Sequence, residues 1–333
     1  GPFEYWDLIG LERGIELIKA QKGQIPQWVA DLQAAGGTSF YKFENGHKKY
    51  FNIQTKKYEP LLGTESLIIL DTYREQTPVL KNSECTVHDI GEGVLCLEFT
   101  SKSNSIGEGI GKGLHEIIEL AEQGDWKGLV IGNNAKQFSV GANLMNIGMF
   151  AMQKQFDVLE RFVDDFQQIN MKIRTSKIPV VVATQGYVFG GGCEISMHCD
   201  AGIYAAESYI GLVEVGVGLL PGGGGTKEFA LRASDDFFEG DVQNPTLINY
   251  FKSIATASVS TSAYEAYDLG YLKKDRDFVC VNTPMNIGRA KDKVLELAKN
   301  YMPPSSRTDI QVLGRGGMSV LYSAINEFRL GEY

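Results

Sequence analysis

The chain has 333 residues, of which 43% are hydrophobic and 22% charged, and its formal net charge at pH 7 is −9. This composition is typical of a folded globular protein, and the length suffices for two domains. The acidic balance argues against a nucleic-acid partner, because binding to phosphate groups requires a surplus of Lys and Arg on one face. The sequence contains no apolar run of membrane-spanning length and does not start with the pattern of a secretion signal.

The cysteines bear on the cellular location of the protein, and the two ends of the chain bear on whether it is part of a longer polypeptide. The five cysteines are scattered and lack the spacing of a zinc-binding or redox motif. We therefore expect reduced thiols and a cytoplasmic location. Because the chain begins at Gly1 without a methionine and stops just after a helical pattern at 323–330, we also expect it to be a piece of a longer polypeptide.

The N-terminal part of the chain predicts helices followed by a hairpin. Apolar residues recur at helical spacing over 3–22, and Pro26 is suited to open a second helix. Aromatic-rich runs at 39–43 and 49–53 flank Asn45-Gly46, and this arrangement is a strong β-hairpin signal.

After a mixed stretch at 57–85, which we interpret as a connector, strands and helices alternate. This alternation predicts an α/β core with a mainly parallel sheet, in which sites gather where strands end and helices begin. Strands are predicted at 93–99, 128–131 and 178–183, and helices at 110–122, 155–170, from about 193, 261–269, 289–299 and 318–328. One face of the helix at 155–170 carries Phe156, Leu159, Phe162, Val163, Phe166 and Ile169.

Two segments, 138–143 and 186–194, each join a buried strand to glycine and then to a polar residue. Glycines at the start of a helix let backbone N–H groups face a ligand without a Cβ in the way. Two such N–H groups that converge on one oxygen would form an oxyanion hole. The alternative, which the residues leave open, is that both segments are tight turns that only close strand–helix corners.

Two acidic residues accompany these segments. Glu194 falls in the first turn of the helix after the glycines, where the helix dipole alone would favour a carboxylate. Glu214 interrupts the apolar run 210–216, so we expect it to be buried and to have a raised pKa. A carboxyl group that holds a proton near neutral pH is suited to general acid catalysis. The glycine-rich turn at 219–225 is expected to line the same cleft.

Other functions lack their motifs. Gly216-x-Gly218 has no third glycine for a dinucleotide-binding fingerprint, and the sequence contains neither a Gly-Lys-Ser/Thr phosphate loop nor a Gly-x-Ser-x-Gly motif. The four histidines have no ligand-like spacing. We expect His198, which follows the second glycine segment, to be structural.

Together these motifs resemble the crotonase superfamily. The similarity rests on 138–143, 190–194, Glu214 and the turn at 221–226, in this order, and it extends from about Val87 to Asp277. It implies an α/β fold with a crotonase-like ββα spiral core at 86–280 and a C-terminal helical segment at 281–333.

The N-terminal stretch resembles a different family, the 3-hydroxyacyl-CoA dehydrogenases, through residues 1–11 and the start of the hairpin at 37–41. This resemblance implies that 1–60 is the remnant of a dehydrogenase helical domain and that 61–85 is a connector. The whole chain then looks like the middle of a fusion protein of fatty-acid β-oxidation. The NAD-binding domain would lie upstream, so no dehydrogenase activity is expected from this fragment.

The crotonase resemblance also implies a reaction, the hydration of 2-enoyl-CoA to 3-hydroxyacyl-CoA by a hydro-lyase. The N–H groups of Ala142 and Gly191 would form the oxyanion hole for the thioester oxygen. Glu194 would deprotonate a water and Glu214 would deliver a proton to Cα, although two coupled carboxyl groups can share or exchange these roles. Neither a metal nor a redox cofactor is implied, because CoA is part of the substrate.

The resemblance further implies a CoA site and partners. Asn143 stands where the family usually has Asp, and 235–257 is longer than in short members, so chain-length preference stays open. Besides the acyl-CoA thioester, the expected partners are further copies in a trimer-type assembly or the missing dehydrogenase domains. The residues that match the family's nucleotide-cradling turns are Lys102, Ser103, Asn104, Val140 and Asn143.

Two alternative functions remain at this point. A Δ3-Δ2-enoyl-CoA isomerase on the same scaffold would need only one carboxylate, so the presence of both Glu194 and Glu214 favours hydration. The second alternative is a non-catalytic crotonase-like domain that binds acyl-CoA or docks the other domains of a fused enzyme.

Overall fold

The computed structural model describes residues 1–44, 47–64, 67–74 and 76–330. The chain divides into two compact units, Gly1–Thr77 and Pro78–Tyr333, and each unit has its own hydrophobic core. The finer division at residues 60, 85 and 280 stays a prediction.

The N-terminal unit consists of short helices and an antiparallel sheet. The helix predicted over 3–22 is broken at Gly10, whose φ of 93° ends the first helix. The predicted hairpin is confirmed by the pairing of two strands, and its Asn45-Gly46 turn lies outside the described residues. The elements are α1 (Pro2–Ile9), α2 (Leu11–Ala20), α3 (Gln27–Ala34), β1 (Tyr41–Glu44), β2 (His47–Asn52) and β3 (Lys57–Pro60). The sequence does not predict β3, whose four residues are too few to show an alternating pattern.

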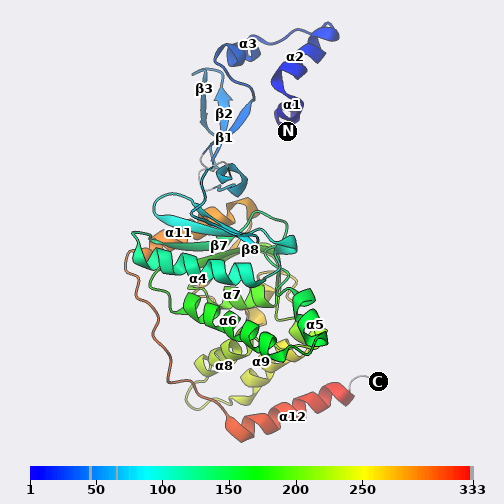
Figure 1. Cartoon of the computed structure of the whole chain (residues 1–333), viewed down its shortest axis with the longest axis vertical. Coiled ribbons are helices and arrows are strands. Elements are labelled where there is room, and N and C mark those ends of the chain that lie inside the picture. The colour runs from blue at the N-terminus through cyan, green and yellow to red at the C-terminus, as the bar shows by residue number, and fades with distance from the viewer. Residues whose placement is uncertain (45–46, 65–66, 75, 331–333) are drawn as a thin grey trace. The chain divides into compact units, whose positions relative to one another are not determined.

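The larger unit is built on a seven-stranded sheet in the order β10-β9-β8-β7-β6-β5-β4 (Figure 1). The strands from β6 to β10 pair in parallel, whereas β4 and β5 pair antiparallel at one edge. The predicted α/β core with a mainly parallel sheet is therefore confirmed. The strands are β4 (Leu80–Lys81), β5 (Cys85–Asp89), β6 (Val94–Phe99), β7 (Gly128–Gly132), β8 (Val180–Phe189), β9 (Ala201–Gly211) and β10 (Asp277–Cys280).

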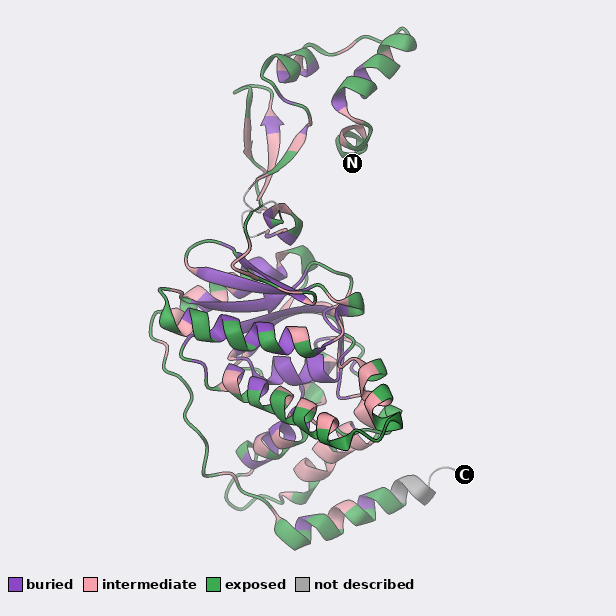
Figure 2. Ribbon diagram, viewed as in Figure 1, coloured by how far each residue is buried: buried purple, intermediate pink, exposed green. Residues whose placement is uncertain are grey.

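Helices cover both faces of this sheet. Because side chains alternate along a strand, one set of strand residues packs in a single core with α4 (Glu108–Gln123), α6 (Phe156–Arg174) and α7 (Gly191–His198). The helix α11 (Asn286–Ala298) packs on the opposite face, where Val294 fills the space beside Gly128. Figure 2 shows that α7 is buried along its whole length, as are most of the strand residues beside it.

The remaining helices complete the larger unit, and two of them contribute Phe229 and Ala266 to the same core. They are α5 (Leu144–Met152), α8 (Gly225–Asp235), α9 (Asn244–Ala255), α10 (Glu265–Asp268) and α12 (Gly314–Leu330). The helix predicted over 261–269 is shorter than expected and begins at Glu265, whose carboxylate accepts a hydrogen bond from the N–H of Thr261. Among the helices in the described ranges, none combines the length and the apolarity needed to span a membrane.

A bulge-type bend in β8 positions the glycine segments. The register of β8 against β9 shifts between Thr184 and Gly186. Gly186 has a φ of 57°, and a Cβ there would lie 2.4 Å from the carbonyl oxygen of Lys136, so the bend requires glycine. Beyond the bend, the N–H of Ser139 donates to the carbonyl oxygen of Tyr187 at 2.9 Å. Segment 138–142 is thereby held beside 186–191.

Candidate active site

A cavity of about 260 Å³ lies between segment 140–142, the start of α7 and one side of α6. Its wall is mostly apolar, and the only titratable side chains among its lining residues are Glu194 and Glu214. Segment 140–142, Gly190 and Gly191 form another part of the wall. The structure therefore brings together, in one cavity, both predicted acidic residues and both predicted N–H donors.

Glu194 occupies the first turn of α7, as the sequence predicts. Its side chain is buried, and its Oε1 accepts a hydrogen bond of 2.8 Å from the N–H of Gly225. Burial, together with repulsion from the Glu214 carboxylate, raises the pKa of Glu194 to about 8. The predicted contribution of the 219–225 turn to the cleft is confirmed, because Gly222 and Gly223 also line the cavity.

Glu214 begins a 3₁₀ turn, η3 (Glu214–Val217), shortly after β9 ends. A Cβ on Gly190 would lie 3.2 Å from the Oε1 of Glu214, so glycine at 190 leaves room for this carboxyl group. The other oxygen, Oε2, is buried and has no hydrogen-bond partner within the described part of the chain. Glu214 as a whole is half-buried, not buried as the sequence predicts, but this partial burial still raises its pKa to about 7, in the predicted direction.

The N–H groups of Ala142 and Gly191 belong to two loops that touch. A Cβ on Gly141, whose φ is 90°, would lie 3.5 Å from the nitrogen of Gly191 and 2.9 Å from the carbonyl oxygen of Phe189. Across the residues that the structure describes, neither the N–H of Ala142 nor that of Gly191 donates to a protein acceptor. Gly191 is also the first residue of α7, where unpaired N–H groups favour a negative charge.

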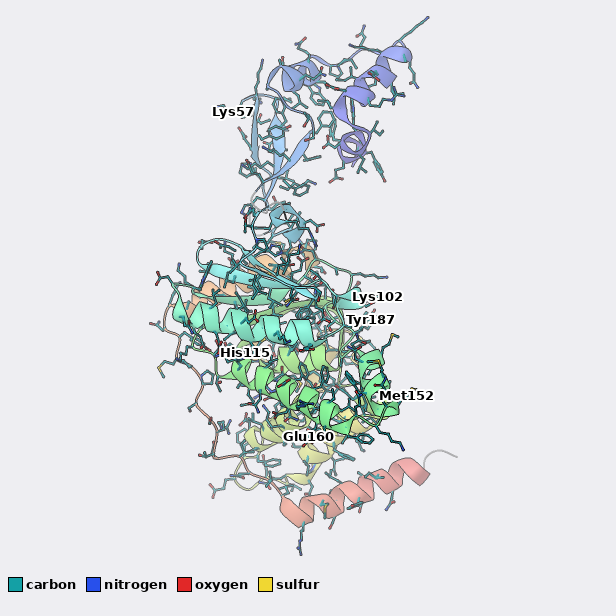
Figure 3. The ribbon with its side chains drawn as sticks, viewed as in Figure 1. Lys57, Lys102, His115, Met152, Glu160 and Tyr187 are labelled. Carbon is teal, nitrogen blue, oxygen red and sulfur yellow. The ribbon has the colours of Figure 1, made fainter. Side chains whose placement is uncertain are left out.

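The residues predicted to hold CoA are divided between the cavity and the surface. Val140 lines the cavity. The Oδ1 of Asn143 accepts a hydrogen bond from the N–H of Met145 and caps α5. Lys102 and Ser103, in the 3₁₀ turn η2 (Lys102–Asn104), are exposed, and Figure 3 shows Lys102 at the surface.

Asn104 has a different place from its neighbours in this turn. It is buried, and its side-chain amide donates to the carbonyl oxygen of Gln137 at 2.9 Å. Its own carbonyl oxygen accepts a hydrogen bond of 2.7 Å from the hydroxyl of Ser139. The Asn104 side chain thus connects the 102–104 turn to the segment that carries Ala142, and it does not line the cavity.

The apolar wall of the cavity comes largely from α6. The sequence predicts one apolar face for this helix, and the structure divides that face between different surroundings. Ile169 is buried in the core, whereas Phe156 is 62% exposed. The cavity is lined by Leu159, Phe162, Val163 and Phe166. Periodicity marks all six residues alike, so the sequence could not distinguish cavity wall from core.

A buried charged cluster lies behind Glu194. The Nδ1 of His198 is 2.6 Å from the carbonyl oxygen of Glu194, and its Nε2 is 2.8 Å from the Nζ of Lys227. The carboxylate of Glu228 accepts from Lys227 and pairs with Arg174 at 2.6 Å. Burial lowers the pKa of His198 to about 3, so its imidazole is neutral, with Nδ1 donating and Nε2 accepting. In the described ranges, no group of three or more His, Cys, Asp or Glu side chains is placed to hold a metal ion.

Comparison with known protein families covers the part of the chain that forms this cavity. Residues 89–238 match the family model described as enoyl-CoA hydratase/isomerase. The chain is 36% identical over 334 residues to a Bacillus subtilis protein named probable 3-hydroxyacyl-CoA dehydrogenase, an alignment that covers 100% of this chain and 41% of that protein. It is 27% identical over 260 residues to a putative fatty acid oxidation complex trifunctional enzyme of Rickettsia felis, covering 78% of this chain and 33% of the relative. The chain thus spans about two fifths or less of these relatives.

Solved structures share the fold at low sequence identity. An enoyl-CoA hydratase from Polaromonas sp. JS666 superposes with a TM-score of 0.54 at 16% identity, over 73% of this chain and 90% of that one. An enoyl-CoA hydratase from Bacillus anthracis gives a TM-score of 0.51 at 20% identity, over 75% of this chain and 92% of that one. These likenesses establish the predicted crotonase-type α/β fold. Together with the match at 89–238, they show that this region is similar to the enoyl-CoA hydratase/isomerase family and has the crotonase-type fold.

Proposed function

We propose that this domain hydrates 2-enoyl-CoA thioesters to 3-hydroxyacyl-CoA, as one part of a larger protein of fatty-acid β-oxidation. The observation that carries the proposal is that the carboxyl groups of Glu194, which is buried, and Glu214, which is half-buried, share one apolar cavity with two backbone N–H groups that are unpaired in the described structure. The names of the relatives, which include hydratases and fatty acid oxidation complexes, support the same reaction class.

In this proposal the thioester oxygen accepts hydrogen bonds from the N–H groups of Ala142 and Gly191. Attack of water at Cβ moves negative charge onto that oxygen, so each N–H stabilises the transition state more than the ground state. Removal of one such donor typically costs about 3 kcal/mol of transition-state stabilisation. The N-terminus of α7 adds a favourable dipole at the same point.

The two carboxyl groups supply the proton transfers. One ionised carboxylate takes a proton from water as the C–O bond forms at Cβ, and one protonated carboxyl gives a proton to Cα. With pKa values of about 8 for Glu194 and about 7 for Glu214, the pair holds close to one proton between them near neutral pH. Either carboxyl group can hold this shared proton, so the acid and base roles can be shared or exchanged between Glu194 and Glu214.

CoA itself would be held along the 102–104 turn and the backbone of 140–143. The exposed Lys102 is available to a phosphate, and Val140 marks the point where the cavity meets this surface. No group beyond the substrate's own CoA is needed for the proposed chemistry.

The test is hydration itself. Purified protein is mixed with a four-carbon 2-enoyl-CoA, and loss of the conjugated thioester absorbance is followed while mass spectrometry checks for the gain of one water. Turnover with that mass gain supports the proposal. If the absorbance persists while a 3-enoyl-CoA is converted, the domain is an isomerase. If no acyl-CoA binds at all, the non-catalytic docking function gains support.

A further inference from the structure

A second cavity, of about 350 Å³, lies between α4 and α6. Its apolar lining comes from Ile106 before α4 and from Phe162, Phe166 and Ile169 on α6. Charged side chains of both helices, such as Lys112 and Asp165, also line it. Charged and polar residues make up half of the lining, and its four apolar side chains offer a contact surface for a hydrocarbon chain.

Phe162 and Phe166 line both this cavity and the candidate active site. They lie one helical turn apart, so both side chains lie on one side of α6 and form a shared partition between the two cavities. On the described lining of the two cavities, Phe162 and Phe166 are the only residues in common. The side chains of Phe162 and Phe166 thus separate a cavity of about 260 Å³ from one of about 350 Å³.

The ring of Phe166 is fitted against the site glycines. A Cβ on Gly191 would lie 3.0 Å from its Cζ, and a Cβ on Gly223 would lie 2.3 Å from its Cε1. That same position on Gly223 is 2.6 Å from the Oε2 of Glu194. The Phe166 ring and the Glu194 carboxylate therefore meet at one glycine, so an acyl chain that runs from Glu194 towards α6 would contact this ring.

We propose that Phe162 and Phe166 form the end wall of the acyl site and set its chain-length limit, and that the α4–α6 cavity is the blocked continuation of that site. The inference rests on the proposed acyl-CoA function and adds the substrate class to it: short-chain thioesters. Each methylene that becomes buried strengthens binding about three- to fourfold, whereas one that remains in water contributes nothing. The wild-type affinity should therefore stop rising once the chain reaches the wall.

The experiment measures binding rather than turnover. Saturated acyl-CoAs of four, eight and twelve carbons are titrated by calorimetry into the whole chain and into Phe162→Ala and Phe166→Ala. We expect the wild-type affinity to level off beyond the short chains. In each variant the ratio of twelve-carbon to four-carbon affinity should rise by about tenfold or more, because several methylenes enter the second cavity.

Leu159→Ala is the matched control, because Leu159 lines the first cavity but not the second. It enlarges the site without removing the partition, so the affinity ratio should stay at the wild-type value. Phe162→Leu, which preserves more of the core packing, should raise the ratio less than Phe162→Ala and guards against misfolding of the alanine variants. Circular dichroism confirms that each variant is folded.

The outcomes separate this inference from the proposed function. An unchanged ratio in the folded Phe variants, an equal rise in Leu159→Ala, or a wild-type affinity that climbs steadily to twelve carbons would overturn the end wall while leaving hydration intact. A shifted ratio in a protein that binds acyl-CoA without hydrating it would support the wall and refute hydration. If the wild type binds no acyl-CoA, both proposals fail.

Discussion

The carboxyl groups of Glu194 and Glu214 are held where ionising both is unfavourable. Glu194 is 2% exposed and receives one backbone N–H, whereas one oxygen of Glu214 receives no partner in the described structure. Burial in apolar surroundings penalises each charge, and the second ionisation is opposed further by the first. The chemistry that we propose depends on this sharing of one proton.

Glu194→Gln and Glu214→Gln should each lower hydratase turnover by about 10²- to 10⁴-fold, because one proton-transfer group is removed while side-chain volume is kept. A glutamine oxygen at 194 still accepts the hydrogen bond from the N–H of Gly225. Steady-state assays and acyl-CoA titrations check the prediction, with binding retained. Glu160→Gln, at an exposed position of α6 labelled in Figure 3, is the control and should keep full activity. Near-normal turnover in either site variant would refute the assignment.

The pH dependence of kcat/KM should be bell-shaped. With pKa values of about 7 for Glu214 and about 8 for Glu194, the singly protonated pair is most populated between these values. Below them both groups hold protons and the base is lost. Above them both are ionised and the acid is lost. A profile measured over pH 5–10 that stayed flat through this window would contradict the role of the pair.

At the level of elements, close contacts between loops define the site. The loop of Gly141 and the turn into α7 approach so closely that a side chain on either would displace the other. Both glycines at the contact, Gly141 and Gly190, have positive φ angles of 90° and 51°. The backbone at these two positions is thus suited to glycine for both space and conformation.

Gly141→Ala should destabilise the protein by about 1–3 kcal/mol, because its Cβ would lie 2.9 Å from the carbonyl oxygen of Phe189 at a strained φ. Hydratase activity should fall with it, since Ala142 moves. The control is Gly148→Ala on α5, where a Cβ meets nothing within 4 Å. That change should be neutral or stabilise by up to about 1 kcal/mol. Denaturant titration of both variants decides; equal stabilities would be evidence against the close contact.

Particular elements show how far the sequence alone could lead. The glycine segments and Glu214 were recognisable because each breaks an apolar pattern, whereas Glu194 was marked by its place in the first turn after the glycines. The continuation of β8 beyond Ala183 could not be predicted, because Thr184 and Gln185 are polar and the strand is irregular there. The helix α5 was also missed, because its nearly uniform apolar sequence has no periodicity and buries none of its residues. Such features depend on partners that are distant in the chain.

On the scale of the whole molecule, all candidate site residues lie in the larger unit. The N-terminal unit has a separate core, built around Leu11, Val29 and Phe51, and is tied internally by the Asp7 carboxylate, which accepts the N–H groups of Phe40 and Tyr41. The cavity, its carboxyl groups and the buried cluster around His198 are parts of one packed body at 78–330. Changes at the site therefore act on the stability of that body.

The double variant Glu194→Gln/Glu214→Gln should gain stability relative to wild type as pH rises. Both carboxyl groups have folded pKa values, about 8 and about 7, above the ordinary 4.5. A raised pKa contributes stability that is fully present below pH 4.5 and is lost as pH rises toward 8. The variant lacks this loss and shares all other titrating groups with wild type. Thermal unfolding of both proteins from pH 4.5 to 8.5 checks the trend, and a constant difference would contradict it.

Local unfolding of the paired segments 138–142 and 186–191 would inactivate the site in a single event. The N–H of Ser139 donates to Tyr187 and the N–H of Phe189 donates back to Ser139, so neither loop can fray while the other stays intact. A partial opening there would displace both proposed thioester-binding amides together and free the 186–189 end of β8, with the rest of the seven-stranded sheet in place. Mild denaturant should consequently abolish hydratase activity at concentrations where the circular dichroism of the whole protein is still native. Deuterium uptake at the amides of residues 139 and 189 should rise in parallel with this loss of activity.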